Sequence, residues 1–280
     1  MTKKPLAWIT DSTAYIPDEL KNHPDFFSIP LNIHFGEKQF IDGVDLTPPQ
    51  LYENIKNATE FPKTSQPSAG EFAEQFKIIA EDYEQAIAIH VSGELSGTLA
   101  SSMAGAQMVD FPITFIDSHS LSSGITGMIE KGMELQHTGA SVEEIIQELK
   151  KMVGTLKNFI YIGQLEQLYK GGRMNGVQFF LGSLLKVKPI IQITPDGKLE
   201  AIDKVRSEKK ALQYLVNKVA ERHKGKGKIY LMQGNVMDTA EELKAMILNQ
   251  VPGLTVEIGD ISSTLAVHAG EGTIAVLWYD

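Results

Sequence analysis

Short apolar runs alternate with helix-like segments through the first half of the chain, and this alternation limits the possible folds more than any other feature. Leu6–Thr10, Ala86–Val91 and Ile113–Ile116 are three such runs. Strands that are apolar along their whole length are typical of parallel sheets that helices cover on both faces. A strand-helix-strand order favours the same arrangement. The first half is therefore predicted to be an α/β domain with a mainly parallel sheet flanked by helices.

The segments between these runs carry the signals of helix starts. A further helix is expected from about Ser122 to Thr138, closed by Gly139. At three places a Ser or Thr is followed three residues later by Glu or Gln, the spacing of a capping box: Thr47/Gln50, Ser68/Glu71 and Ser141/Glu144.

One segment does not follow this rhythm. Phe26–Phe35, a Gly36-Glu37 turn and Lys38–Ile41 predict a β-hairpin. The hairpin, residues 26–41, can leave the first sheet and pack on the second domain.

The pattern changes after about Lys157. Residues 187–194 and 199–205 are expected to pair through the turn Pro195-Asp196-Gly197. Hairpin strands together with helices describe an α+β domain with a mixed or antiparallel sheet. We therefore predict two domains, 1–155 and 156–280, with the ligand site in the cleft between them. The other expected elements are strands at 159–162, 228–232, 254–258 and 273–278 and helices at Val177–Leu185, 207–223 and 238–250.

Composition narrows the classes of partner. The 280 residues carry 26 basic and 35 acidic side chains, a net charge of −9, which disfavours nucleic acid and anionic membrane surfaces as partners. Because the chain has no cysteine, disulfides and thiolate metal sites are excluded. No stretch approaches the roughly 18 apolar residues of a membrane span. We expect a cytoplasmic protein without stable membrane insertion.

The sequence lacks the common motifs for binding nucleotides and metal ions. The chain contains no G-x-x-x-x-G-K-[ST] loop, no G-x-G-x-x-G fingerprint, no H-E-x-x-H and no G-x-S-x-G nucleophile elbow. None of the seven histidines lies three or four residues from another, which argues against a helical metal site. We therefore expect no metal and no cofactor.

Two short polar stretches are the strongest candidates for a binding site. Thr64–Ser68 and Ser92–Thr98 each lie where the pattern becomes helical. A helix start offers unpaired N–H donors and the positive end of the dipole, and Ser, Thr and Gly let a ligand oxygen approach closely. The two stretches together predict a cradle for one small anionic group. The alternative is that their hydroxyls only cap helices.

Three other stretches stand out. Asp11-Ser12-Thr13 follows the first strand, at the end of the sheet where open α/β folds bind ligands, or else it caps the next helix. Lys170–Gly176 places Arg173 among glycines, where it can hold a carboxylate or phosphate, or the glycines simply end a helix. His268 lies beside flexible glycines and is a candidate ligand-binding imidazole, although a lone histidine is usually structural.

In combination these motifs resemble the DegV family, whose members act as the fatty-acid-binding subunit of bacterial fatty acid kinase. Thr64–Ser68 is similar to the TSQPS signature of that family, and Leu95–Thr98 is similar to its LSGT signature. The resemblance spans essentially the whole chain, with Glu271 where the family commonly has proline. The remaining similar motifs are Asp11–Thr13, Gly172-Arg173, Asn175-Gly176 and His268 with its glycines.

The resemblance implies two α/β-type domains with a long-chain fatty acid in a tunnel between them. It assigns the fatty-acid carboxylate to Thr64, Ser96, Gly97 and His268. It also implies that Arg173 lies at the surface where a kinase subunit docks. In the family that partner binds ATP and transfers phosphate, giving an acyl-phosphate for phospholipid synthesis. The present chain would then be a non-catalytic subunit whose only bound small molecule is the fatty acid.

A serine hydrolase acting on lipids or esters is the alternative. In that case Ser96 would be the nucleophile, His268 the base, and Asp260 the acid that orients the base. The missing nucleophile-elbow sequence argues against this function.

Overall fold

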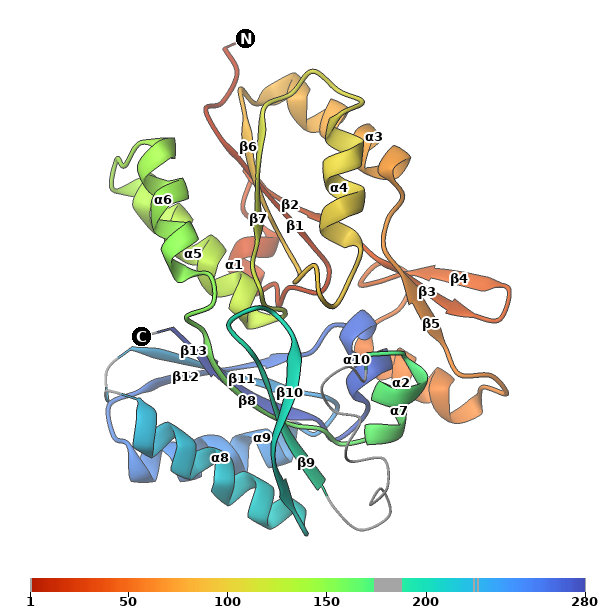
Figure 1. Cartoon of the computed structure of the whole chain (residues 1–280), viewed down its shortest axis with the longest axis vertical. Helices are drawn as coiled ribbons and strands as arrows, with labels where there is room; N and C mark the ends of the chain where they lie inside the picture. The colour runs from red at the N-terminus through yellow and green to blue at the C-terminus, as the bar shows by residue number, and fades with distance from the viewer. Residues whose placement is uncertain (1, 174–187, 224, 226, 280) are drawn as a thin grey trace.

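The computed structural model describes residues 2–173, 188–223, 225 and 227–279, and it contains two large β-sheets and a small third one (Figure 1). The first large sheet has four strands in the order β2-β1-β6-β7, and every neighbouring pair is parallel. These strands are β1 Ala7–Asp11, β2 Phe26–Ile29, β6 Ala86–His90 and β7 Ile113–Asp117.

Helices cover both faces of this sheet, as the continuous apolar strands predict. Trp8 and Ile89 pack in a buried cluster with side chains of α5 and α6, whereas Ile9 packs with α3 on the opposite face. Gly132 of α5 is required for this contact, because a Cβ atom there would lie 2.1 Å from the Trp8 ring. The elements are α1 Asp18–Lys21, α3 Ala69–Asp82, α4 Thr98–Ala106, α5 Ser123–His137 and α6 Val142–Met152.

The second large sheet has six strands in the order β10-β9-β8-β13-β11-β12. It is mixed, because β11 and β12 are parallel and the other neighbouring pairs are antiparallel. The mixed sheet and the pairing of β9 with β10 were both predicted. The strands are β8 Lys157–Tyr161, β9 Lys188–Ile193, β10 Leu199–Val205, β11 Lys228–Gln233, β12 Thr255–Asp260 and β13 Ile274–Trp278.

Side chains alternate between the two faces of the second sheet. Phe159 and Tyr161 pack in a cluster with α8 Glu208–Arg222 and α9 Met237–Gln250, which cover the outer face. Ile160 points to the opposite face, where it packs in a second cluster with side chains of α7 Leu165–Lys170 and α10 Ser263–Ala269. The six strands all follow Leu156 in the chain, and the division into domains 1–155 and 156–280 remains a prediction.

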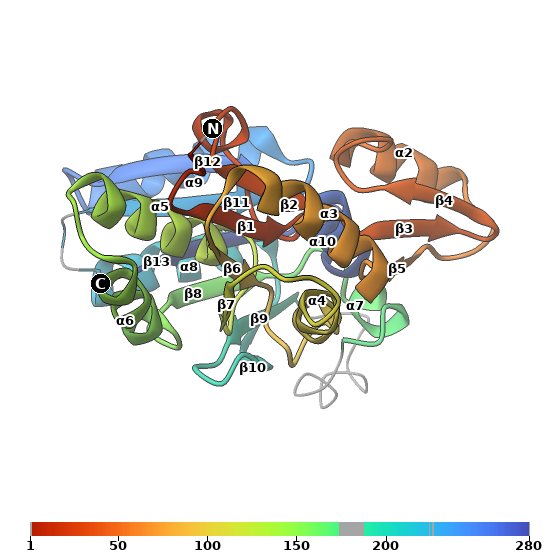
Figure 2. The same ribbon diagram turned by 90° about the horizontal axis from the view of Figure 1, so that it is seen from above.

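The small third sheet lies to one side, where it projects with α2 Pro48–Asn57 (Figure 2). Its strands, in the order β4-β3-β5, are β3 Asn32–Phe35, β4 Lys38–Ile41 and β5 Lys63–Ser65. The expected hairpin over 26–41 was too long, since Phe26–Ile29 is a strand of the first sheet and Pro30, which cannot donate to a ladder, separates it from β3. The sheet contacts α10 Ser263–Ala269, which belongs to the second half of the chain.

The helix-start predictions can be checked at the caps. The Ser68 and Ser141 hydroxyls each accept the N–H three residues on, and the backbone N–H of each serine donates to the carboxylate of Glu71 or Glu144. At Thr47 the backbone N–H donates to Gln50 Oε1 at 2.9 Å. α7 Leu165–Lys170 was not predicted, and the predicted helix Val177–Leu185 lies outside the described residues.

Among the described helices, none is both long and apolar enough to cross a membrane. The part of the chain that the structure describes also holds no group of three or more His, Asp or Glu side chains arranged for a metal ion.

Candidate functional site

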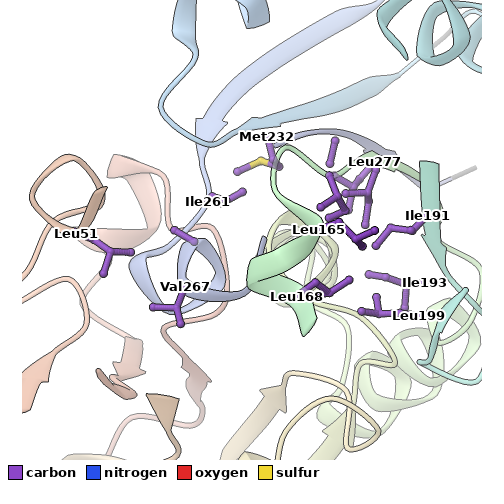
Figure 3. Close-up of a cluster of buried hydrophobic side chains, with 14 of the residues drawn as sticks. Leu51, Leu165, Leu168, Ile191, Ile193, Leu199, Met232, Ile261, Val267 and Leu277 are labelled. Carbon is purple, nitrogen blue, oxygen red and sulfur yellow. The ribbon is translucent and has the colours of Figure 1, made fainter. Parts of the chain in front are cut away.

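A cavity lies between the two large sheets, next to a cluster of buried side chains from α7, α10 and the inner face of the second sheet (Figure 3). The cavity has a volume of about 100 Å³. Its wall is mostly apolar and comes from both halves of the chain. Val91, Leu95 and Leu121 line it from the first half, and Ile160, Ile191, Leu199 and Leu277 from the second.

The two polar stretches singled out in the sequence lie side by side at this cavity. The Ser101 hydroxyl, one turn into α4, donates to the Pro67 carbonyl at 2.5 Å. A Cβ atom on Gly97 would lie 2.9 Å from the Gln66 side chain, and one on Gly105 would lie 2.7 Å from the α3 backbone. The last turn of α4 is thus packed against the start of α3 too closely for a side chain at Gly105.

Thr64 and His268 are brought into direct contact across the molecule. Thr64 Oγ1 and His268 Nε2 are 2.8 Å apart, and both residues line the cavity. Thr64 is held by the pairing of β5 with β3, where it lies opposite Ile33. His268 is in the last turn of α10, whose first turn is capped by the Ser262 hydroxyl.

His268 is largely buried and keeps one ring nitrogen without a partner. Burial, followed by the nearby positive charge of Arg173, lowers the pKa of His268 to about 3, so the imidazole is neutral at pH 7. Its Nδ1 atom makes no hydrogen bond to any described residue. A Cβ atom on Gly171 would lie 2.1 Å from Nδ1, so the glycine is what allows the ring to sit there.

Arg173 was expected on the surface, but it is half-buried and lines the cavity. Its Nε donates to the Leu95 carbonyl at 3.2 Å and its Nη1 to the Gly171 carbonyl at 2.8 Å. Burial also lowers the pKa of the guanidinium below its ordinary value. Arg173 therefore joins the end of α7 to the loop that carries Ser96.

Ser96 lines the cavity as well, but Gly97 does not. The Ser96 hydroxyl shares a hydrogen bond with the Thr98 hydroxyl at 2.8 Å and accepts the Thr98 N–H at 3.3 Å. Gly97 is exposed and packs against Gln66. Of the predicted site residues, the structure thus gathers Thr64, Ser96, Arg173 and His268 at one cavity.

The constellation of the alternative hydrolase is not assembled. Ser96 bonds to Thr98 and His268 to Thr64, and no hydrogen bond joins Ser96 to His268 among the described residues. Asp260 is bonded to Gln233 and lies outside the cavity lining.

A Ser-His-Asp arrangement does exist elsewhere, deep in the first half. His90 Nδ1 lies 3.0 Å from Asp11 Oδ2, and His90 Nε2 lies 2.8 Å from Ser102 Oγ. All three side chains are fully buried and none lines the cavity, so a substrate has no access to them. Asp11 also accepts the N–H and hydroxyl of Thr13 and the N–H of Val91. The opening motif Asp11–Thr13 therefore holds loop ends together.

Several residues of the cavity wall were missed in the sequence. Leu168 of α7 lines the cavity, and the three-residue spacing of Leu165 and Leu168 before Gly171 is the signal that could have revealed this short helix. Ser122 and Thr264 also line it, and their hydroxyls are buried without partners among the described residues. No local pattern distinguishes these two residues from helix caps.

Comparison with known proteins gives a consistent result over the whole chain. A family model described as "Uncharacterised protein, DegV family" matches residues 5–280. A DegV domain-containing protein of Staphylococcus aureus strain COL is 34% identical over 280 residues, which are 99% of each chain. A DegV family protein of Thermus thermophilus, described in terms of its fatty acid binding, superposes with a TM-score of 0.91 at 28% identity, covering 99% of this chain and 100% of that one. DegV of Bacillus subtilis, described as a fatty acid binding protein, gives a TM-score of 0.89 at 31% identity over 98% of this chain and 99% of that one. With its two-sheet fold and these matches, the chain belongs to the DegV family.

Proposed function

We propose that this protein binds one long-chain fatty acid in the cavity between the sheets and presents its carboxylate to a separate ATP-dependent kinase subunit. The observation that carries the proposal is the position of Thr64, Ser96 and His268, which gather polar groups at one place in an otherwise mostly apolar cavity wall. The fatty-acid binding described for the Thermus and Bacillus relatives supports the same ligand class.

The mostly apolar wall decides how much the fatty-acid tail and the carboxylate each contribute to the binding free energy. Burying about 14 methylenes at ~0.8 kcal/mol each amounts to roughly 11 kcal/mol before the costs of ordering. A hydrogen bond to a charged group contributes only about 1.5 to 3 kcal/mol. The tail therefore sets the affinity, and the polar groups set where the head lies.

The carboxylate needs donors, because a buried charge without partners is costly. The Thr64 and Ser96 hydroxyls at the cavity supply two, and we propose the N–H of Gly97, which follows Ser96 outside the cavity lining, as a third. We place the proton of the neutral His268 ring on Nε2, where it donates to Thr64 Oγ1 and leaves the Thr64 hydroxyl hydrogen for the carboxylate. Arg173 adds the positive charge among the cavity-lining residues.

The kinase part of the proposal rests on the family resemblance of the motifs. We place the docking and phosphate-transfer role at Arg173, which follows α7 and reaches the Ser96 loop. Its position beside the head-group residues lets one side chain affect both the ligand and the partner.

Organic extraction of the purified protein followed by mass spectrometry tests the first part. One equivalent of long-chain fatty acid is expected from a preparation that was never delipidated. A folded, never-delipidated protein that yields no stoichiometric lipid, and that takes up none when it is offered, would overturn the proposal.

A further inference from the structure

A second polar feature of the cavity is at the start of α5, on a different element from Thr64 and His268. Ser122 is the N-cap residue of α5, lines the cavity and is 2% exposed. Its hydroxyl makes no hydrogen bond to any residue that the structure describes. An N-cap serine normally accepts an N–H from the first helical turn, which Ser122 does not do.

The backbone explains why the cap bond is missing. Ser122 has φ 52° and ψ −133°, a conformation that is costly for any residue except glycine. The turn is anchored to the end of β1 by a bond of 3.0 Å from Ser122 N–H to the Thr13 carbonyl. The Thr13 hydroxyl beside it is already used, because it donates to Asp11 at 2.6 Å. Ser122 thus has an unused donor at this corner of the cavity.

The unpartnered Ser122 hydroxyl indicates which kind of ligand group it would bind. A buried hydroxyl without a partner is unfavourable, and a saturated hydrocarbon chain cannot supply one. The charged side chain of the cavity lining, Arg173, is bonded to the carbonyls of Leu95 and Gly171, so this corner offers no cation for a second carboxylate. The start of α5 favours an electronegative atom through its dipole.

We propose that Ser122 hydrogen-bonds a neutral oxygen substituent, a hydroxyl or keto group, on the tail of the bound fatty acid. The preferred ligand is then an oxygenated long-chain fatty acid. This inference rests on the proposed function and adds a specificity-determining residue to the same cavity.

The test is the affinity of the delipidated wild-type protein for stearic acid and for a series of monohydroxystearic acids in which the hydroxyl is moved along the chain. One position, or two adjacent ones, should bind about three- to tenfold more tightly than stearic acid, the value of one net hydrogen bond. The other positions should bind more weakly than stearic acid, because they bury a hydroxyl without a partner.

Variants at two neighbouring serines identify the contact. Ser122→Ala should remove the preference while leaving stearic acid binding in place, and Ser122→Gly, which suits the positive φ, should do the same if the alanine variant folds poorly. Ser123→Ala is the matched control, because Ser123 is buried with an unpartnered hydroxyl but does not line the cavity. It should keep the preference.

Two results would overturn the inference while the proposed function stands. One is a series in which no hydroxy acid binds more tightly than stearic acid. The other is a preference that survives both Ser122 variants. Failure of stearic acid and every hydroxy acid to bind would instead overturn the proposed function and the inference with it.

Discussion

Two histidines of the molecule, His90 and His268, are in opposite situations. His90 is fully buried, with both ring nitrogens bonded, to Asp11 at 3.0 Å and to Ser102 at 2.8 Å. His268 has one bonded nitrogen, at 2.8 Å from Thr64, and one without a partner, and it lines a cavity. A polar network with every group satisfied specifies the fold. Bonding capacity left over beside a cavity indicates a ligand, so the same residue type has two different roles here.

The largest effect should come from breaking the closed network. Asp11→Ala leaves His90 and the N–H groups of Thr13 and Val91 without their acceptor, so the free energy of unfolding should fall by about 3 to 5 kcal/mol. His268→Gln should lower it by only about 1 kcal/mol, because a single hydrogen bond is lost. Urea denaturation at pH 7 gives both values. Equal losses from the two substitutions would contradict the contrast drawn between the histidines.

The next effect concerns the open site and its partner. Arg173→Ala should reduce acyl-phosphate formation with the proposed kinase subunit and ATP at least thirtyfold, the result of losing about 2 kcal/mol at an interface. Fatty-acid affinity should change much less, since the tail supplies most of it.

An NMR titration of His268 gives an independent check on the Arg173→Ala variant. Because Arg173 is one cause of the low pKa of His268, its removal should raise that pKa in an NMR titration. Equal loss of binding and phosphorylation would confine Arg173 to the lipid site. If the variant keeps both fatty-acid binding and phosphorylation, the loop around Arg173 serves only to end helix α7.

The cavity residue His268 and the buried carboxylate Asp11 should also differ in how they couple stability to pH. The pKa of His268 falls from 6.5 to about 3 on folding, so the unfolded chain binds the extra proton as the pH drops below 6.5. The ligand-free protein should therefore lose about 2 kcal/mol of stability between pH 6.5 and pH 5 through this group. His268→Gln should flatten that part of the curve, and His137→Gln, at an exposed position on α5, serves as the control.

Asp11 affects the free energy of unfolding in a lower pH range. Burial alone would raise the pKa of Asp11, but its bonds to His90 and Thr13 outweigh burial and hold that pKa below the ordinary 3.8. The stabilisation from Asp11 is therefore present above about pH 3.8 and is lost only as the pH falls through the lower folded value. A slope between pH 6.5 and pH 5 that His268→Gln leaves unchanged would contradict this separation.

The smallest effect should come from single head-group hydroxyls. Thr64→Val and Ser96→Ala should each weaken fatty-acid binding by about 1.5 kcal/mol, roughly tenfold, while the fold stays intact. Thr59→Val, at an exposed loop position, is the matched control and should have no effect. Calorimetric titration of delipidated protein measures all three. Unchanged affinity in both head-group variants would remove these residues from the carboxylate site.

The regular parts of the fold could be predicted because their signals are local. Continuous apolar strands predicted the parallel sheet, and the capping boxes at Ser68 and Ser141 predicted where helices begin. The errors occurred where local pattern is ambiguous. Phe26–Ile29 fits a hairpin strand and a parallel strand equally well, and the six residues of α7 offer only the single Leu165/Leu168 spacing as a helical signal.

The site was less predictable, since its residues meet only through tertiary packing. The helix starts pointed to Thr64 and Ser96, and their loops do lie together. The proximity of His268 to Thr64 and the burial of Arg173 follow from how α10 and α7 pack, which no spacing in the sequence encodes. Asp11 showed the converse: a residue at a typical ligand-binding position proved to be fully buried and structural.

The contact between Thr64 and His268 has a consequence for how the protein is made. The two residues are 204 positions apart in the chain. During synthesis the ribosome exposes the first sheet, and then most of the apolar wall, well before α10 emerges. A ligand that needs both residues can stabilise only the finished chain. Occupancy by such a ligand would therefore report completed synthesis and folding, and truncated products would not be stabilised by it.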